Sequence, residues 1–589
     1  MLSIIFLWGL IIFCSIPLGL FVLNNLKVSF LSRSFDRFII SFWIGISIIS
    51  LIQLFLSGWF VLNFWFPLAF SLFSLALLQN TKVKSEFTQW WKTLFLQRSI
   101  FLGGIFILFS SAFYMVNSPI VWDDSGGYHI GNIEWLSQYG MTYGIGLIHH
   151  RLAILSSWNT VVASFNHALF EHRVFSITNG LVLFLLLLQI VVLLNRLSSN
   201  RRGISDFYLL IFIGSVLMIS LYKKMFHSAS SDIPIYFVTI FVSWSILLLL
   251  EAKKENKGEV MGIELPYLLS SFAVGYKFFI VPVVVVTFVL YFFLSKSKIR
   301  SIFFSFVLGV IVLAIIASSG YKASGCFWFP VSICIESPWS VGQQEASRFS
   351  KESIDAAVDA LGRVPEDKIN SISWIWYWAK ATKSNFIAFI LLLLSAILFT
   401  KGILTRSEDK HPALHWLFFM GIFGLLFLLL NSPDPRYNWG YFLLIPSTIP
   451  IIFSKYVLKK NSFVFSYFSA FMLISIFIIL VSFKKDPLFY EEKLLNMIET
   501  GRIKNAKQDS RIFMPPKLIP FSQNRVSHTE FELEPFKLIK KKAGDLDYYL
   551  PNTGNSCWNA PLPCANIIIK EDLRLKNPKE GLLGGIVKR

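Results

Sequence analysis

The sequence predicts an all-α polytopic membrane protein, on the evidence of its composition and its recurring apolar runs. Of the 589 residues, 54% are hydrophobic and only 15% are charged, which is too apolar for a water-soluble protein. Each run is long enough to cross a hydrocarbon layer of about 30 Å as a helix. The runs begin near residues 2, 38, 60, 100, 174, 207, 233, 301, 384, 413, 440 and 462.

The apolar run at residues 264–294 differs from the others because Gly275, Lys277 and Pro282 interrupt it. Glycine and proline weaken helices, and a lysine inside hydrocarbon is costly. The run therefore predicts two short helices that meet near Lys277, which brings the expected total to about 14 transmembrane helices. Residues 1–483 then form a membrane body, and residues 484–589 form a small external C-terminal segment.

The basic residues of the short loops predict the orientation of the helices, because lysine and arginine are enriched in cytoplasmic loops. They gather in alternate loops, at Lys27, Arg33, Arg37, Lys82, Lys84, Lys92, Arg98, Arg196, Arg201, Arg202, Lys253, Lys254, Lys296, Lys298, Arg300, Lys401, Arg406, Lys455, Lys459 and Lys460. Residues 118–173 and 320–383 then lie outside, and Lys223 with Lys224 is the exception. The net charge of +19 is thus a topology signal, so the expected partner is the lipid bilayer and not nucleic acid.

Four of the five cysteines form two close pairs in regions that are predicted to be external. Cys326 is paired with Cys334, and Cys557 with Cys564. Small disulfide loops are expected there if the compartment is oxidising, and free thiols are the alternative. The close CxxC spacing of a zinc site is missing.

The first external loop carries an acidic pair, Asp123 and Asp124, directly after an apolar segment. Apolar residues then recur at helical spacing over residues 128–139 and again over residues 152–169, with Arg151 before the second stretch. This pattern predicts two amphipathic helices at the membrane interface. A carboxylate beside them could act as a general base or bind a divalent cation. The alternative is a solvated turn with a helix cap.

Ionisable residues also occur where later helices reach the outer surface, at Asp232, Lys277, Asp434 and Arg436. Such residues need a partner or water, and they are site candidates by default. Lysine and arginine suit a phosphate group. The alternative for the two aspartates is helix capping together with an internal pair to arginine. His129 could relay a proton, although a structural, hydrogen-bonded histidine is the favoured interpretation.

Several short blocks of the chain resemble the GT-C superfamily of integral membrane glycosyltransferases. In more detail they resemble an uncharacterised bacterial multipass membrane protein family that is assigned to that fold. The blocks lie at residues 124–129, 146–153, 156–158, 324–330, 432–437 and 557–564. The resemblance implies a GT-C-like body with interfacial helices in the first external loop. It also implies a location in the bacterial cytoplasmic (inner) membrane, with the active site facing the periplasm or exterior.

The function implied by the resemblance is transfer of a sugar from a polyprenyl phosphate carrier to a cell-envelope acceptor, which could be a glycan, a lipid or a protein. In such enzymes an acidic residue of the first loop removes the proton of the acceptor hydroxyl, and direct displacement inverts the anomeric centre. Asp124 matches that position, with Asp123 beside it. Lys277, Arg436 and Arg151 would hold the donor phosphate by position and charge.

The remaining site residues implied by the resemblance would orient the reacting groups. They are Asp232, His129, Asp434 and Tyr128. Members of the superfamily work both with and without a metal, so a divalent cation such as Mg²⁺ or Mn²⁺ stays an open expectation. The chain departs from many members in having Gly126 and Gly127 before Tyr128, where a larger side chain is usual.

Two other functions fit the same composition. A polymerase or ligase of lipid-linked glycans would place basic residues in a large late external loop, and residues 320–383 carry several. A flippase or transporter of lipid-linked glycans would show paired halves with matching broken helices, and the sequence shows no such symmetry. A purely structural scaffold would leave the acidic loop and the outer cations unexplained.

Overall fold

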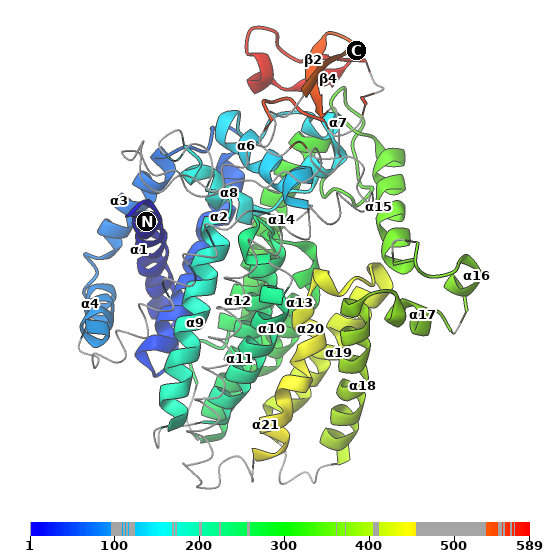
Figure 1. The fold of residues 1–589 in the computed structure, drawn as a ribbon. Coiled ribbons are helices and arrows are strands. Elements are labelled where there is room, and N and C mark those ends of the chain that lie inside the picture. Colours follow the sequence, from blue (N-terminus) through cyan, green and yellow to red (C-terminus); the bar gives the residue numbers. More distant parts are fainter. Residues whose placement is uncertain are drawn as a thin grey trace, which may run out of the picture.

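The computed structural model in Figure 1 is a bundle of helices with a small β structure at one end. It describes residues 2–95, 109, 112, 116, 120, 124–167, 170, 174–198, 203–222, 225–255, 260–360, 362–371, 373–404, 411–454, 538–551, 557, 560–565, 568–569 and 572–589. The expected helices near residues 100 and 462, Asp123, and the pair Lys223 and Lys224 lie outside these ranges.

Among the described residues, seven helices are long and apolar enough to cross a membrane. They are α1 (Leu2–Asn25), α2 (Ser34–Leu56), α9 (Ile177–Ser198), α11 (Asp232–Glu255), α14 (Lys298–Ser324), α18 (Lys383–Leu404) and α19 (Ala413–Asn431). Shorter apolar stretches are Trp65–Leu77, Ile204–Ser220, Leu265–Gly275, Phe278–Leu294 and Trp439–Ile452. The prediction of a helical membrane body is confirmed for the described residues, and the number of about 14 spans stays a prediction.

The other helices of the body are shorter or lie in its loops. They are α3 (Trp65–Leu77), α4 (Thr81–Phe95), the π-helical turn η1 (Ser125–His129), α6 (Ile130–Gln138), α7 (Ile145–Ile148), η2 (His150–Ala153), α8 (Ser157–Phe165), α10 (Ile204–Tyr222), η4 (Met225–His227), α12 (Leu265–Phe272), η5 (Ala273–Gly275), η6 (Phe278–Ile280), α13 (Val281–Leu294), α15 (Gln343–Val358), α16 (Glu366–Ile369), α17 (Trp374–Ala381), η8 (Pro435–Tyr437), α20 (Trp439–Leu444), η9 (Pro446–Thr448) and α21 (Ile449–Ile452).

The 23 residues of α2 separate the two ends of the body by roughly 35 Å, at about 1.5 Å per helical residue. Arg33 lies just before α2, and at the other end the Ser57 carbonyl accepts a hydrogen bond from the amide of Met141 in the segment 118–173, at 2.7 Å. We call these the basic end and the site end. The helices α1 and α2 pack closely, since a Cβ on Gly19 would lie 1.9 Å from the Ser41 carbonyl oxygen.

The basic end is held together by buried ion pairs. Arg33 pairs with Asp206 at 2.6 Å, and Arg196 pairs with Asp36 at 2.7 Å and with Asp206 at 3.4 Å. The side chain of Asp206 is fully buried, so these contacts compensate a charge that would otherwise be costly. The arginines that the sequence places in cytoplasmic loops therefore join the ends of α2, α9 and α10.

The interrupted run at residues 264–294 forms the two short helices that the sequence predicts. The pair α12 and η5 leads to Tyr276 and Lys277, and η6 and α13 lead away from them. The amide of Met261 donates to Ser29 Oγ at 3.1 Å, which places the start of α12 at the basic end. The Lys277 tip consequently lies at the site end. Tyr276 fixes this tip, because its hydroxyl bonds to Ser47 of α2 at 2.8 Å and its carbonyl accepts from Ser156 at 2.9 Å.

In residues 118–173, which the sequence predicts to be external, α6 and α8 lie where two helices are predicted, but α8 has no exposed face and is not the amphipathic surface helix that the sequence predicts. All nine residues of α8 are buried, and Ser157 of this helix bonds to Ser50 of α2 at 3.1 Å. The predicted second stretch starts later than the sequence suggests, because Leu152 belongs to η2 and α8 begins at Ser157. The loop therefore packs on the helical body rather than covering it as an independent surface layer.

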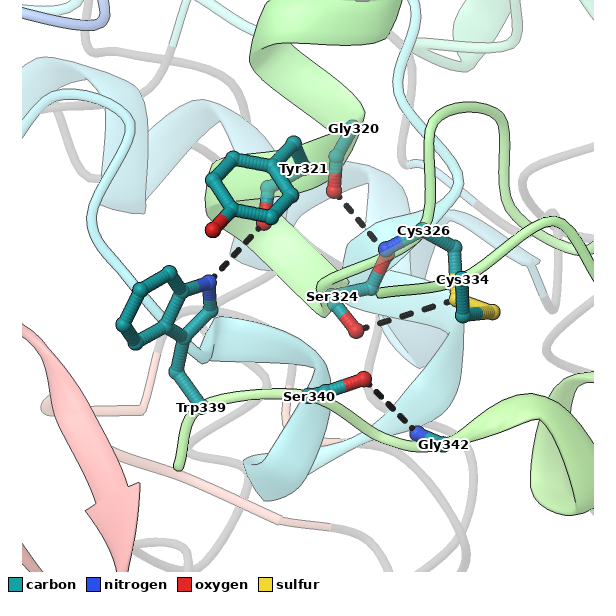
Figure 2. The surroundings of a disulfide bond; sticks show 8 residues. All are labelled: Gly320, Tyr321, Ser324, Cys326, Cys334, Trp339, Ser340 and Gly342. Carbon is teal, nitrogen blue, oxygen red and sulfur yellow. Dashed lines mark hydrogen bonds between the residues drawn. A yellow bond between two sulfur atoms is a disulfide. The ribbon is translucent and has the colours of Figure 1, made fainter. Parts of the chain in front are cut away.

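Both predicted disulfides form, Cys326 to Cys334 and Cys557 to Cys564, whereas Cys14 is a buried free thiol in α1. Figure 2 shows the first of them directly after α14. On the same side, the indole Nε1 of Trp339 donates to the Tyr321 carbonyl at 3.1 Å, so the segment after the disulfide turns back onto α14.

Two antiparallel ribbons form the described part of the C-terminal segment. Strand β1 (Leu538–Ala543) pairs with β2 (Leu546–Pro551), and β3 (Leu573–Leu575) pairs with β4 (Ile586–Lys588). Figure 1 shows them at the site end, near α7. The amide of Ile586 donates to the Tyr143 carbonyl at 2.8 Å, and the amide of Lys588 donates to the Pro338 carbonyl at 2.7 Å. Residues 586–588 thus join the segment that contains Tyr143 to the segment after α14.

Gly144→Ala is expected to loosen this contact. Gly144 has φ +74°, and an added Cβ would lie 2.1 Å from the Ile586 carbonyl oxygen. Gly362 is a matched control, because it has nearly the same φ, +75°, but nothing within 4 Å of an added Cβ. Both variants bear the cost of a left-handed alanine, and only Gly144→Ala adds overpacking of about 1–3 kcal/mol. Protease cleavage within residues 572–589 measures the difference, and equal cleavage in both variants would contradict the prediction.

Candidate functional site

The carboxylate of Asp124 lies between two arginines from distant parts of the chain. Its Oδ1 accepts a hydrogen bond from Nη1 of Arg151 at 3.2 Å, and its Oδ2 accepts from Nη1 of Arg436 at 3.1 Å. The side chain of Asp124 is 16% exposed, compared with 45% for Arg151 and 39% for Arg436. Each carboxylate oxygen therefore faces one cation, at a place that water still reaches.

Local structure explains how Asp124 and Arg151 meet. Asp124 stands at the start of the π-helical turn η1, and its side chain makes no capping hydrogen bond there. Single π-helical turns often occur at functional sites. A Cβ on Gly127 would lie 4.0 Å from Nη1 of Arg151, so the glycine that departs from the superfamily pattern leaves room for this arginine. The alternative of a simple helix cap is not supported for Asp124.

Arg436 is held from several sides. Its Nε lies 2.9 Å from Oδ2 of Asp434, and its amide donates to Oδ1 of the same aspartate at 2.9 Å. The carbonyl of Arg436 accepts a hydrogen bond from the hydroxyl of Tyr236 on α11. Asp434 thus both caps η8 and pairs with arginine, as the structural alternative for this residue predicts. Because Asp434 contacts both the amide and Nε of Arg436, it holds the guanidinium of Arg436 beside Asp124.

Lys277 forms an ion pair with Asp232, the first residue of α11. The side chains are 20% and 6% exposed, and Oδ2 of Asp232 also accepts from Ser230 Oγ at 3.1 Å. Lys277 therefore does not contact Asp124 directly, although its charge acts on it. The structure brings six predicted site residues into one cluster with three carboxylates and three cations, which are Asp124, Asp232, Asp434, Arg151, Lys277 and Arg436.

Aromatic rings support the cations of this cluster. The ring of Tyr437 lies 4.6 Å from Nζ of Lys277 and 5.2 Å from the guanidinium carbon of Arg436, and it stacks on Phe279 at 4.6 Å. Arg151 lies 5.8 Å from the ring of Tyr128. Such cation–π contacts stabilise a cation at a fixed position. Sequence reasoning missed Tyr437 and Phe279, and the only available signal was an aromatic residue directly after Arg436 and two residues after Lys277.

The electrostatic surroundings keep Asp124 ionised. Burial alone raises the pKa of its carboxyl, but Arg436, His129, Arg151 and Lys277 together outweigh burial and hold the pKa below its ordinary value. Burial also lowers the pKa of His129 to about 4, so this imidazole is neutral at pH 7. His129 is 3% exposed, and its Nδ1 has no hydrogen-bond partner among the described residues.

The charged cluster does not fit a divalent cation in this arrangement. In the described part of the chain, no three histidine, cysteine, aspartate or glutamate side chains are grouped to hold a metal ion. Asp124, Asp232 and Asp434 each face a basic side chain, whereas Mg²⁺ and Mn²⁺ need oxygen ligands that converge on one point. Asp123 lies outside the described residues.

Comparison with known proteins gives a family but no function. No curated protein and no solved structure matches the chain. One family model, described as a domain of unknown function (DUF8201), matches residues 1–443. The matched region contains all six residues of the charged cluster, whereas the C-terminal ribbons lie beyond it. Because the match covers most of its length, the chain belongs to the DUF8201 family.

Proposed function

We propose that the protein is a membrane glycosyltransferase that moves a sugar from a polyprenyl phosphate-linked donor to a cell-envelope acceptor. The observation that carries the proposal is the Asp124 carboxylate, ionised and partly exposed between Arg151 and Arg436. A base for the acceptor and cations for a phosphate leaving group are the two things that this transfer needs.

In the proposed reaction Asp124 accepts the proton of the acceptor hydroxyl. The hydroxyl oxygen forms a bond to the anomeric carbon of the donor, and the bond from that carbon to the phosphate oxygen breaks. The electron pair leaves with polyprenyl phosphate, whose negative charge is stabilised by Arg436, Arg151 and Lys277. Fixed cations are effective here because they need no reorganisation when the charge develops.

The segregation of charges supports an outer location for the site. Arg33, Arg196 and Lys253 lie at the basic end, and α2 and α11 separate them from the charged cluster. Because basic ends face the cytoplasm, the site end would face the periplasm or exterior of a bacterial inner membrane. A polyprenyl chain can then stay in the outer leaflet while the acceptor approaches from water.

A flippase of lipid-linked glycans is the second candidate, and one observation favours it. The broken segments α12–α13 and α20–α21 both pass near the charged cluster, and transporters often build their sites from broken helices. The polymerase or ligase alternative has less support. Two of its expected basic residues already have carboxylate partners, since Arg348 pairs with Glu345 at 2.6 Å and Lys368 with Asp367 at 2.7 Å.

The test is an assay of the purified protein in liposomes with a panel of polyprenyl phosphate sugars and cell-envelope acceptors. Release of polyprenyl phosphate together with sugar on the acceptor is the expected result. Movement of the intact donor between leaflets without bond cleavage would instead identify a flippase. No reaction and no movement with any donor would reject the proposal.

A further inference from the structure

The two arginines that bracket Asp124 are held very differently. Arg436 has a second carboxylate in Asp434, a stacked partner in Tyr437 and a backbone anchor in Tyr236. Among the described residues Arg151 pairs with one carboxylate only, that of Asp124, and its side chain is the more exposed of the two. An ion pair that is partly exposed is weak and can be exchanged.

A donor phosphate brings negative charge to a cluster that has no excess of positive charge. The three carboxylates and three cations balance one another. Arginine binds phosphate through a fork of N–H groups, at least as well as it binds a carboxylate. Arg151 is the cation that can turn to the phosphate at least cost. In the described structure its guanidinium is held only by Asp124 and by the ring of Tyr128.

We propose that Arg151 is exchanged between Asp124 and the donor phosphate. Without donor it covers Oδ1 of Asp124, and the arriving phosphate draws it away, which frees that oxygen to accept the acceptor's proton. The inference rests on the proposed function for the identity of its ligand. It adds an order of events, since the base becomes available only after the donor phosphate is bound.

The electrostatics agree with this order. Burial raises the pKa of the Asp124 carboxyl, and Arg436, His129, Arg151 and Lys277 together lower it further than burial raises it. Loss of Arg151 as a neighbour therefore makes the carboxylate more basic. The titratable and charged groups around Asp124 come from η1, η2, the η8 turn, α11 and the α12–α13 tip, and they are Tyr128, His129, Arg151, Asp434, Arg436, Asp232 and Lys277. Burial lowers the pKa of His129 to about 4, so this imidazole is charged only in acid, where its charge also lowers the pKa of Asp124.

The exchange can be measured without turnover. Protein with ¹³C-carboxyl-labelled aspartate is placed in nanodiscs of zwitterionic lipid, and the infrared difference between wild type and Asp124→Asn isolates the Asp124 band. The band is titrated with pH alone, with polyprenyl phosphate, with inorganic phosphate and with neutral polyprenol. Polyprenyl phosphate is expected to raise the midpoint by about one pH unit or more, since an adjacent opposite charge lowers a carboxyl pKa by 1–3 units. Polyprenol is expected to leave it unchanged.

Variants of Arg151 distinguish two causes of a shifted midpoint: the movement of Arg151 away from Asp124, and the direct effect of the phosphate charge on Asp124. In Arg151→Gln the midpoint should already be high, and polyprenyl phosphate should raise it less than in wild type. Arg151→Lys keeps the charge and should keep the wild-type response. An unchanged midpoint in wild type, or an undiminished shift in Arg151→Gln, would overturn the inference. An equal shift with inorganic phosphate would support the exchange and show that the phosphate group suffices.

Failure of the exchange and failure of the proposed function can be told apart. If polyprenyl phosphate moves the Asp124 titration but no sugar is transferred in the liposome assay, the exchange stands and the transferase is rejected. If sugar is transferred without any shift of the titration, the transferase stands and the exchange is rejected.

Discussion

Asp124→Asn is expected to lower the rate of sugar transfer about 100- to 10,000-fold, which is the usual contribution of a general base. Asparagine has the shape of aspartate but cannot take up a proton from a hydroxyl group at neutral pH. Its carbonyl oxygen can still accept from one arginine, and Arg436 keeps its pair with Asp434. The fold is therefore expected to persist while turnover is lost.

The rate of polyprenyl phosphate release at saturating donor is the measurement for this variant. A matched control is Asp367→Asn, which removes the same charge from an exposed residue whose ion pair in the described part of the chain is with neighbouring Lys368. The control should retain wild-type turnover and the same melting temperature. Full activity of Asp124→Asn would reject Asp124 as the base, and an equal loss in both variants would point to a general effect of charge.

Lys277→Met is expected to lower the free energy of unfolding by about 3–5 kcal/mol, because it leaves a buried carboxylate unpaired. Asp232 is 6% exposed, and after the change only Ser230 remains as a side-chain hydrogen-bond donor in the described contacts. The double variant Lys277→Met with Asp232→Asn removes the unpaired charge. It is expected to recover most of the stability, because burying two neutral groups costs far less than burying one charge.

Donor binding separates the structural role of Lys277 from its proposed role at the phosphate. The double variant should bind polyprenyl phosphate more weakly than wild type even though it is stable. The matched control is the exposed pair Lys540 and Asp547, which lie 2.7 Å apart, and Lys540→Met should leave unfolding unchanged. Wild-type affinity in the stable double variant would contradict a phosphate role for Lys277. Equal instability of the single and double Lys277 variants would contradict the ion-pair argument.

Local patterns in the chain predicted several elements correctly. Residues that are close together in the sequence predicted the break at Lys277, the presence of helices at α6 and α8, and both disulfides. The ribbons β1–β2 and β3–β4 were not expected, because their strands are short and β3 and β4 are joined through a long turn. Their attachment to Tyr143 depends on contacts that no local pattern encodes.

The site was predicted as a set of residues, but of its ion pairs only the one between Asp434 and Arg436 was foreseen, as the structural alternative. Lys277 and Arg436 were grouped as phosphate ligands by charge and position alone. In the structure Lys277 forms an ion pair with Asp232, and Arg436 forms ion pairs with both Asp434 and Asp124. The aromatic support from Tyr437 was missed because a ring beside a cation in sequence does not specify where that ring packs.

The sequence by itself determined that the protein belongs to the membrane class, that its body is helical, and that basic residues gather in alternate loops. Each span must satisfy its own backbone hydrogen bonds in lipid, so this information is local and can be read from hydropathy and loop charge. Only the tertiary structure decided which charges meet. Asp124 and Arg436 are 312 positions apart, and their contact follows from how the helices between them pack, through close, specific contacts that composition does not record.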